Sequence, residues 1–361
     1  MSAAVQSSAD VVVVGAGVVG IAVARLSASR GYSTVLLESA DSFGQGVSSR
    51  NSAVIHAGLY YPTESMKAQL CVRGRELIYE YCEERRVPHK EIGKYVVASS
   101  ASETDSLEHL FWNAKDNGCH EVKLFSRQDV EVKKGQLEAV GILHSPRTGI
   151  VDSPQLMLSM LGDFENAGGV CAWRSHVHAM EEDAQGVTLQ VANGYIFKAN
   201  KVVNAAGLGA LDLIEQSVGQ DFSHAYARGD YYLYSGSVPF DKLVYPLPVP
   251  GGLGVHLTFD MGGGVRFGPD VTWVESPEAK VDLGKEGAFA EAIRKYWPSI
   301  DVTKLRPGYA GIRPKIKEKG SLLPDFKIVK GANGNVITLL GIESPGLTCC
   351  MALAELIIDE L

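Results

Sequence analysis

The order of apolar and polar positions predicts a strand–helix–strand unit near the start of the chain. The run Val11–Val14 is typical of a short buried strand, and a glycine-rich turn over residues 15–20 follows it. Residues 21–30 carry apolar side chains at helical spacing, and residues 34–37 form a second short apolar run that ends at Glu38. Two strands joined by a helix in this way favour a parallel β-α-β unit.

Later patterns predict an α/β fold (α+β over the whole chain) in which a Rossmann-type part is combined with an antiparallel sheet. A helix is expected from residues 152–154 to a Gly-Gly stop, followed by a strand-like stretch over residues 170–180. Residues 198–210 read as a strand that runs into Ala-Ala-Gly, and residues 336–361 as a strand, a loop and a helix. Residues 226–267 alternate aromatic, polar and Gly/Pro positions, which is typical of antiparallel strands.

Composition and charge narrow the possible functions. The chain has 361 residues, 45% of them apolar, and a net charge of −8, which argues against non-specific nucleic-acid binding. The six cysteines include no C-x-x-C pair and no zinc spacing, so we expect no metal site and reduced thiols. The expected location is cytoplasmic, and mitochondrial or peripheral membrane association stays open. The longest apolar run, residues 11–24, is too short and too rich in glycine to cross a membrane, and no leader peptide is visible before Arg25.

The turn after the first strand has the spacing of a dinucleotide-binding loop. Gly15 allows the tight turn, Gly17 allows the backbone to approach a pyrophosphate, and Gly20 allows the helix to pack on the strand. The helix N-terminus then presents N–H groups and a positive dipole end to the phosphates. Glu38 stands where the motif places an acid for the ribose hydroxyls, which disfavours the 2′-phosphate of NADP.

The motif alone does not separate NAD from FAD, but the rest of the chain favours FAD. Gly346, Leu347 and Thr348 open the last predicted helix, and its positive end suits the N1–O2 edge of a flavin. No second strand–G-x-G-x-x-G–helix unit occurs in the sequence. The other glycine clusters, at residues 251–254 and 262–264, lie in a turn-rich β context instead. The sequence therefore predicts no separate nicotinamide site.

Several longer motifs resemble a known family. The N-terminal motif, "VVNAAG", "AGIRP" and "GIESPGLT" resemble the D-amino-acid-oxidase superfamily of FAD-dependent oxidoreductases. Within it, "SSRNSAVIHAGLYYP", "RGDYYLY", "LVYPLPVPGGLGVHLT", "FGPD" and "GYAGIRPK" resemble the L-2-hydroxyglutarate dehydrogenase branch. The resemblance covers residues 10–361, although residues 99–140 carry no motif that places them.

The resemblance implies two interleaved domains and a set of cofactor contacts. The FAD-binding domain would comprise residues 1–86, 145–222 and 305–361, and the substrate domain residues 87–144 and 223–304. The implied contacts to FAD, beyond the glycine loop, are Ser49, Arg50, Asn51, His56, Val177, Ala206 and Gly207. Covalent and non-covalent flavin attachment at His56 both remain open.

Oxidation of a hydroxy acid requires a base, because the hydroxyl proton must leave as hydride departs. A neutral imidazole suits that role near pH 7, and His256 and His56 stand in motif positions, with His256 slightly favoured. By the same resemblance Arg313 would bind the substrate carboxylate, since a guanidinium fork fits a carboxylate bidentately.

Further side chains are expected near the substrate. Lys315 or Arg228 would meet a second carboxylate, as a five-carbon diacid demands. Tyr231 and Tyr232 would line the pocket or pack in the core.

Three functions are compatible with these residues. The favoured one is FAD-dependent oxidation of a small-molecule 2-hydroxy acid, with L-2-hydroxyglutarate converted to 2-oxoglutarate. The second is an amino-acid or amine oxidase on the same scaffold, and the third is a flavoprotein that binds FAD without catalysis. Oxygen, a quinone and an electron-transfer protein all remain open as the electron acceptor, and so does the oligomeric state.

Overall fold

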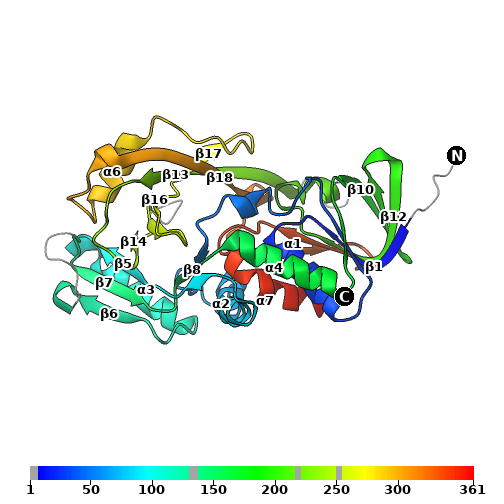
Figure 1. The fold of residues 1–361 in the computed structure, drawn as a ribbon, viewed down its shortest axis with the longest axis horizontal. Helices are drawn as coiled ribbons and strands as arrows, with labels where there is room; N and C mark the ends of the chain where they lie inside the picture. The colour runs from blue at the N-terminus through cyan, green and yellow to red at the C-terminus, as the bar shows by residue number, and fades with distance from the viewer. Residues whose placement is uncertain (1–6, 130–136, 216–220, 249–253) are drawn as a thin grey trace. The chain divides into compact units, whose positions relative to one another are not determined.

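The computed structural model describes residues 7–129, 137–215, 221–248 and 254–361 (Figure 1). The chain divides into two compact units, and each unit is built from separate stretches of sequence. Unit 1 comprises Met1–Ser49, Ser153–Tyr226 and Arg313–Leu361, whereas unit 2 comprises Arg50–Asp152 and Ala227–Ile312. Of the turn-rich stretch 251–254, residues 251–253 lie outside the described residues.

Unit 1 contains the predicted Rossmann-type sheet. Among the described residues its eight strands pair in the order β10-β11-β12-β1-β2-β9, with β21 beside β12 and β20 beside β21. The strands are β1 (Ser7–Val14), β2 (Thr34–Leu37), β9 (Val170–Ala172), β10 (Val177–Asp183), β11 (Gly186–Val191), β12 (Tyr195–Asn204), β20 (Lys327–Lys330) and β21 (Val336–Leu340). The pairs β1–β12, β1–β2, β2–β9 and β12–β21 are parallel, so the fold class predicted from the sequence is confirmed for this unit.

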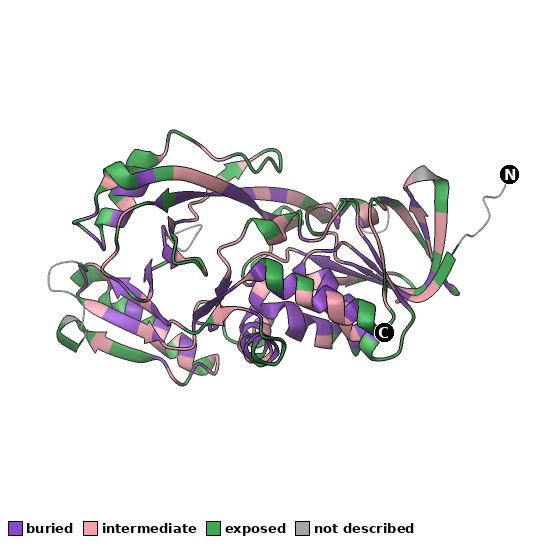
Figure 2. Cartoon of the chain, in the orientation of Figure 1, coloured by how far each residue is buried: buried purple, intermediate pink, exposed green. Residues whose placement is uncertain are grey.

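Among the described residues, three α-helices accompany this sheet: α1 (Val18–Ser29), α4 (Ser153–Asn166) and α7 (Gly346–Ile358). Helix α1 packs against both α4 and α7 (Figure 1). The strands beside these helices are largely buried. Helix α4, in contrast, has both buried and exposed residues along its length (Figure 2). Val11–Val14 therefore form a continuous apolar strand because helices and neighbouring strands remove them from water.

Unit 2 contains the predicted antiparallel sheet. The ten strands described for this sheet follow the order β19-β18-β13-β16-β15-β14-β5-β7-β6, with β17 beside β13. Their bounds are β5 (Lys94–Ala98), β6 (Lys123–Ser126), β7 (Gly141–Ser145), β13 (Phe222–Tyr234), β14 (Leu243–Pro246), β15 (Leu257–Phe259), β16 (Val265–Phe267), β17 (Thr272–Val274), β18 (Leu305–Glu318) and β19 (Ser321–Leu322). The chain passes from one unit to the other within β13 and within β18, and β19 follows in unit 1. The pair β14–β5 is parallel, and it joins a strand from each of the two sequence segments of unit 2.

A second, smaller sheet and three helices complete unit 2. The sheet has the order β3-β8-β4 and is formed by β3 (Val54–Ile55), β4 (His89–Lys90) and β8 (Gly149–Val151). The helices are α2 (Met66–Arg85), α3 (Thr104–Asp116) and α6 (Glu286–Arg294). Helix α3 and strand β6 occupy the stretch 99–140, for which the sequence offered no motif.

The first boundary between the units differs from the sequence prediction. Residues 50–86 were expected in the FAD-binding domain, but they cluster with unit 2. The reason is the packing of α2, since Arg75 on this helix forms an ion pair with Glu121 and donates a hydrogen bond to the carbonyl of Ala57. The assignment of each unit to cofactor or substrate stays a proposal.

Two general features complete the description. No disulfide joins the six cysteines, all of which lie in the described ranges. Within those same ranges, no helix is both long enough and apolar enough to cross a membrane.

Candidate functional site

The predicted cofactor residues of unit 1 gather at one edge of its sheet. Strands β2, β1, β12 and β21 are neighbours and run parallel, so their carboxyl ends meet at the same edge. In register, Val14 lies beside both Leu37 and Asn204, and Asn204 lies beside Thr338. The segments that follow these strands contain Gly15, Gly17, Gly20, Glu38, Ala206, Gly207, Gly346, Leu347 and Thr348. In open α/β sheets, ligands bind at the carboxyl ends of the strands.

The three glycines of the loop differ in what a side chain at each position would meet. Gly15 has a φ of +102°, and a Cβ there would lie 2.6 Å from the carbonyl oxygen of Ala205. A Cβ at Gly20 would lie 1.9 Å from the carbonyl oxygen of Gly15, so helix α1 can approach the loop only without a side chain at this position. A Cβ at Gly17 would meet only the hydroxyl of Ser48, at 3.1 Å. The protein fold therefore demands Gly15 and Gly20, whereas Gly17 leaves open backbone for a ligand.

Helix α1 begins directly at this loop. Gly17 is its N-cap and has no side chain of its own to cap the helix, and the first turn carries no acid. The hydroxyl of Ser48 accepts a hydrogen bond from the N–H of Val18 (3.0 Å). A helix end without an acidic side chain keeps its positive dipole available to an anion.

Glu38 is linked to the glycine loop. Its Oε2 accepts a hydrogen bond from the N–H of Ala16 (2.7 Å), and its Oε1 accepts one from the N–H of Ala40 (2.8 Å) and one from the hydroxyl of Ser39 (3.1 Å). A carboxylate has about four acceptor sites, so these three bonds leave capacity for a ribose hydroxyl. The acid therefore both stabilises the loop and keeps the acceptor role that the sequence predicts for it.

The other unit 1 candidates take different positions. Val177 is buried in β10 and packs in the same apolar cluster as Val14 and Leu37. Gly207 has a φ of +62° and opens a short 3-10 turn beside Ala206. The hydroxyl of Ser49 is exposed and donates to the carbonyl of Gly46.

Helix α7 presents a second available helix end. It starts at Gly346, has no side-chain cap and carries no acid in its first turn. Together with the open backbone at Gly17 and the acceptors of Glu38, this end fits a flavin dinucleotide.

In unit 2, the segment that carries Arg50, Asn51 and His56 is held by its own hydrogen bonds. The Oδ1 of Asn51 accepts from the N–H of Ala53 (2.6 Å), and the carbonyl of Asn51 accepts from the hydroxyl of Tyr309 (2.8 Å). Arg50 is exposed. His56 follows β3 directly and is 7% exposed.

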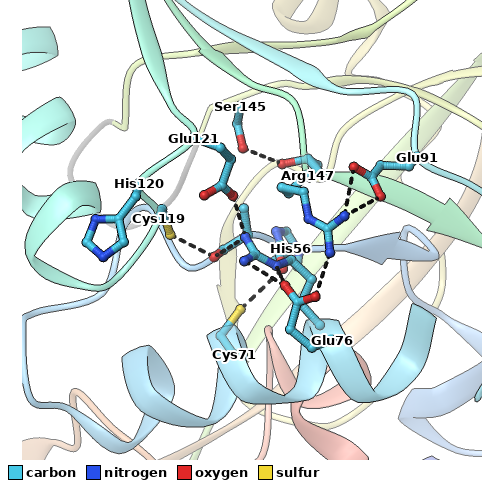
Figure 3. A network of polar contacts seen from close by, with 12 residues as sticks. His56, Cys71, Glu76, Glu91, Cys119, His120, Glu121, Ser145 and Arg147 are labelled. Atoms are coloured by element: carbon cyan, nitrogen blue, oxygen red, sulfur yellow. Dashed lines mark hydrogen bonds and ion pairs between the residues drawn. The ribbon is translucent and has the colours of Figure 1, made fainter. Parts of the chain in front are cut away.

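A network of polar side chains fixes the backbone at His56 (Figure 3). The thiol of Cys71 donates to the carbonyl of His56 (3.5 Å), and the thiol of Cys119 donates to the carbonyl of Ala57 (2.9 Å). Arg75 also donates to the carbonyl of Ala57 (3.4 Å). These anchors come from α2 and from the residues after α3, and the sequence gave no local signal for them because the partners are far apart along the chain.

Two asparagines extend this anchoring along the same segment. Asn113 donates to the carbonyl of Leu59 (2.8 Å), and Asn117 donates to the carbonyls of Gly58 (3.0 Å) and Tyr61 (2.8 Å). The stretch without a sequence motif therefore stabilises the His56 segment.

The two histidines proposed as bases belong to one cluster of unit 2. The ring of His256 stacks on the ring of Tyr245, with centroids 3.5 Å apart and planes 8° apart. The Nζ atom of Lys94 lies 4.7 Å from the centroid of Tyr245 and 4.6 Å from that of Tyr60. Burial, together with the charge of Lys94, lowers the pKa of His56 to about 3. His56 is therefore a neutral imidazole near pH 7, and its low pKa weakens it as a base, which favours His256 for that role.

His256 itself lies just outside a strand. The sequence suggested that His256 lies within a strand, whereas β15 begins at Leu257. The carbonyl of His256 accepts a hydrogen bond from the N–H of Gly268 (2.9 Å), which holds the backbone in place.

The predicted substrate residues Arg313, Lys315 and Arg228 differ in their surroundings. Arg313 lies in β18 and is partly buried. Lys315 forms an ion pair with Glu343 (2.5 Å), whose side chain is 8% exposed. Arg228 lies between two carboxylates, Asp230 at 3.3 Å and Asp282 at 3.4 Å.

The two tyrosines of β13 are both buried. Tyr231 stacks on Tyr309, with ring centroids 4.5 Å apart. Tyr232 is fully buried, its hydroxyl donates to the carbonyl of Asp282 (2.8 Å), and its ring packs 4.4 Å from that of Phe289. Of the two possibilities left open for Tyr232, the structure favours core packing.

Comparisons with known proteins agree with the fold and with the cofactor. A family model described as FAD dependent oxidoreductase matches residues 10–360. The L-2-hydroxyglutarate dehydrogenase of Arabidopsis thaliana mitochondria is 39% identical over 97% of this chain and 83% of its own length. The human mitochondrial enzyme of the same name is 29% identical over 98% of this chain and 89% of its own length.

Solved structures show the same fold. L-α-glycerophosphate oxidase from Mycoplasma pneumoniae, with FAD bound, superimposes with a TM-score of 0.90 at 22% identity, over 99% of this chain and 95% of that chain. Glycine oxidase from Geobacillus kaustophilus gives a TM-score of 0.83 at 22% identity, over 98% and 94% of the two chains.

Proposed function

This chain belongs to the FAD-dependent oxidoreductase family, and we propose that it oxidises L-2-hydroxyglutarate to 2-oxoglutarate. The observation that carries this proposal is a chain of contacts in unit 2: the charge of Lys94 acts on His56, the Nζ atom of Lys94 lies over the ring of Tyr245, and that ring stacks on His256. A neutral imidazole is the group that alcohol oxidation needs, whereas a neutral amine loses hydride with the help of its own lone pair. The likeness to relatives named L-2-hydroxyglutarate dehydrogenase supports the choice of substrate.

The residues of unit 1 would bind the cofactor. FAD, when bound, supplies the acceptor for a hydride. The open backbone at Gly17 and the N-terminus of α1 would bind the pyrophosphate, and Glu38 would accept hydrogen bonds from the ribose. The N-terminus of α7 would stabilise negative charge at the N1–O2 edge of the flavin.

Three further side chains would act on the substrate. Arg313 would bind the carboxylate next to the reacting carbon through a bidentate, charge-assisted pair. His256 would accept the hydroxyl proton as the C2 hydrogen leaves with its electron pair, which avoids a protonated carbonyl in the transition state. His56, neutral and fixed by Cys71 and Cys119 through its backbone segment, would orient the reacting groups.

Anaerobic reduction of the bound flavin tests this function. Mixing the holoenzyme with L-2-hydroxyglutarate should bleach the flavin absorbance and produce 2-oxoglutarate in equal amount. Bleaching by amino acids with release of ammonia, and none by the hydroxy acid, would establish an amino-acid oxidase instead. A flavin that neither class of substrate reduces would indicate a protein that binds FAD without catalysis.

Two properties are addressed by further measurements. Re-oxidation of the reduced enzyme by oxygen, a quinone or an electron-transfer protein identifies the electron acceptor. The cytoplasmic location stays a prediction, which fractionation of cells tests.

A further inference from the structure

Lys94 is a lysine buried inside unit 2. It is the first residue of β5, where its backbone lies in register with Leu243 of β14 and Ser145 of β7. Its side chain is fully buried, and within the described part of the chain its Nζ atom has no hydrogen-bond partner. The ammonium group lies over the faces of Tyr60 and Tyr245 and also interacts electrostatically with the thiols of Cys71 and Cys119.

Such a group is unfavourable unless something compensates its burial. A buried charge is normally paired with an opposite charge, and cation–π contacts offset only part of the lost hydration. Burial accordingly lowers the pKa of Lys94 to about 7. Four other buried or partly buried cations have carboxylate partners: Arg75 with Glu121, Arg228 with Asp230, Lys285 with Asp230 and Asp270, and Lys315 with Glu343.

The surroundings of Lys94 indicate what its partner would be. The hydroxyls of Tyr60 and Tyr245 are also buried without a hydrogen-bond partner among the described residues. The charge of Lys94 acts on His56, and Tyr245, over whose ring the ammonium group lies, stacks on His256. Lys94 is therefore linked to both histidines proposed as bases, to His56 through its charge and to His256 through the ring of Tyr245. An anionic group bound here would be part of the substrate.

We propose that Lys94 binds the distal carboxylate of a dicarboxylic 2-hydroxy acid and so makes the enzyme selective for diacids. This inference rests on the proposed function. Lys94 takes the role at the second carboxylate that the sequence suggested for Arg228 or Lys315. Each of those two cations is already paired with a carboxylate of its own unit. Arg313 keeps the carboxylate next to C2. A substrate with an apolar tail would leave the ammonium unpaired, and sites built for a polar group reject analogues that lack it.

The test compares two substrates in the holoenzyme with Lys94→Met. Methionine matches the volume of lysine and removes the charge. L-2-hydroxyglutarate and L-2-hydroxyvalerate have the same five-carbon chain, but the second has a methyl group in place of the distal carboxylate. For Lys94→Met, kcat/KM for L-2-hydroxyglutarate should fall by about 10- to 150-fold, the factor for one charge-assisted hydrogen bond. The value for L-2-hydroxyvalerate should stay level or rise.

Two further measurements separate binding from folding. Glutarate, which carries both carboxylates but no hydroxyl, should bind the oxidised Lys94→Met holoenzyme more weakly by a similar factor, as measured by calorimetry. The melting temperature should stay level or rise, because replacing an unpaired buried charge by an apolar side chain is often stabilising. If Lys94→Met does not yield folded protein, Lys94→Arg keeps the charge and should keep the preference for the diacid.

Lys242→Met is the matched control. Lys242 also lies over a tyrosine ring, that of Tyr95 at 5.7 Å, but it is paired with Asp241 (3.1 Å). This variant should treat both substrates as the wild type does. The proposal is overturned if Lys94→Met lowers kcat/KM equally for both substrates, or if the ratio of the two kcat/KM values stays as in the wild type.

The outcome also distinguishes the two levels of inference. If the wild-type flavin is reduced by neither hydroxy acid, the proposed function fails. The Lys94 site would still be supported if Lys94→Met weakened glutarate binding and Lys242→Met left it unchanged. The site would be wrong if the wild type and both variants bound glutarate equally.

Discussion

Replacing Gly20 by alanine should destabilise the protein and release FAD. A Cβ at this position would stand 1.9 Å from the carbonyl oxygen of Gly15, whereas real Cβ atoms keep at least about 3.0 Å from such atoms. The helix and the loop must therefore separate by about 1 Å. The opposing atom belongs to the backbone, so no side-chain rotation relieves the contact. Overpacking of this kind costs about 3 kcal/mol, and the better helix propensity of alanine returns about 1 kcal/mol, which leaves a net loss of about 2 kcal/mol.

Gly17→Ala provides the comparison. Its Cβ would meet only the hydroxyl of Ser48, at 3.1 Å, and that hydroxyl belongs to a side chain that can rotate. The exchange of glycine for alanine at an N-cap costs under about 1 kcal/mol. We therefore expect Gly17→Ala to fold nearly as the wild type does but to lose FAD, because the methyl group occupies the path of the pyrophosphate.

Urea unfolding of the FAD-free proteins and the ratio of flavin to protein after purification measure the two effects separately. If Gly20→Ala has the same unfolding free energy as the wild type, the argument that a Cβ at this position collides with the carbonyl of Gly15 is wrong. Full FAD occupancy in Gly17→Ala would refute the assignment of this loop to the pyrophosphate, while the structural argument for Gly20 would remain.

Four further predictions follow from the site. Arg313→Lys should lower kcat/KM for L-2-hydroxyglutarate by roughly 30-fold or more, since a bidentate charged contact is lost; near-native efficiency would contradict that role. His256→Ala should slow flavin reduction by about 10²–10⁴-fold in stopped-flow experiments and keep FAD bound, and a native rate would remove His256 as the base. The pKa of His56 falls from 6.5 to about 3 in the folded state, so its contribution to the unfolding free energy is complete above pH 6.5 and is lost as the pH falls toward 3. Between pH 8 and pH 5 the unfolding free energy measured in urea should fall by about 2 kcal/mol because of this group, and His56→Asn should abolish that part of the decrease. Asn117→Ala removes two hydrogen bonds to the His56 segment and should lower the unfolding free energy by about 1–3 kcal/mol, so an unchanged value would show that the anchor is dispensable.

The cofactor unit was predictable because its signals are local. The glycine spacing, the apolar run before it and Glu38 lie within one short stretch of sequence, and the structure has β1, α1 and β2 there. Helix α1 starts three residues earlier than expected, at Val18, because Gly17 serves as its N-cap. The strand expected over residues 170–180 is divided into β9 and β10, and Arg174 between them has a φ of +55°.

The candidate site was predictable only in part. His56 and His256 were found because they stand in motifs, but the sequence did not indicate that Lys94 lies near His56 and over the ring of Tyr245, which stacks on His256. That neighbourhood arises from the parallel pairing of Lys94 with Leu243, residues far apart along the chain. Likewise, Asn113 and Asn117 lie in the stretch 99–140, which carries no motif in the sequence, and their contacts with the His56 segment exist only in the folded unit.

The discontinuity of unit 1 has a consequence for how the protein is made. A domain usually folds as it leaves the ribosome, with the N-terminal part first. Here the first strand, β1, lies between β2 and β12, and β12 requires β21 as its other parallel neighbour. Helix α1 likewise remains uncovered on one side until α7 has been synthesised. Unit 1, which we propose binds FAD, is therefore among the first parts to emerge and among the last to be completed, so we expect FAD to be captured only after residues 336–358 have been translated. A premature stop codon that removes α7 should leave an apoprotein with an exposed apolar helix, which is a substrate for chaperones and proteases rather than a slightly weakened enzyme.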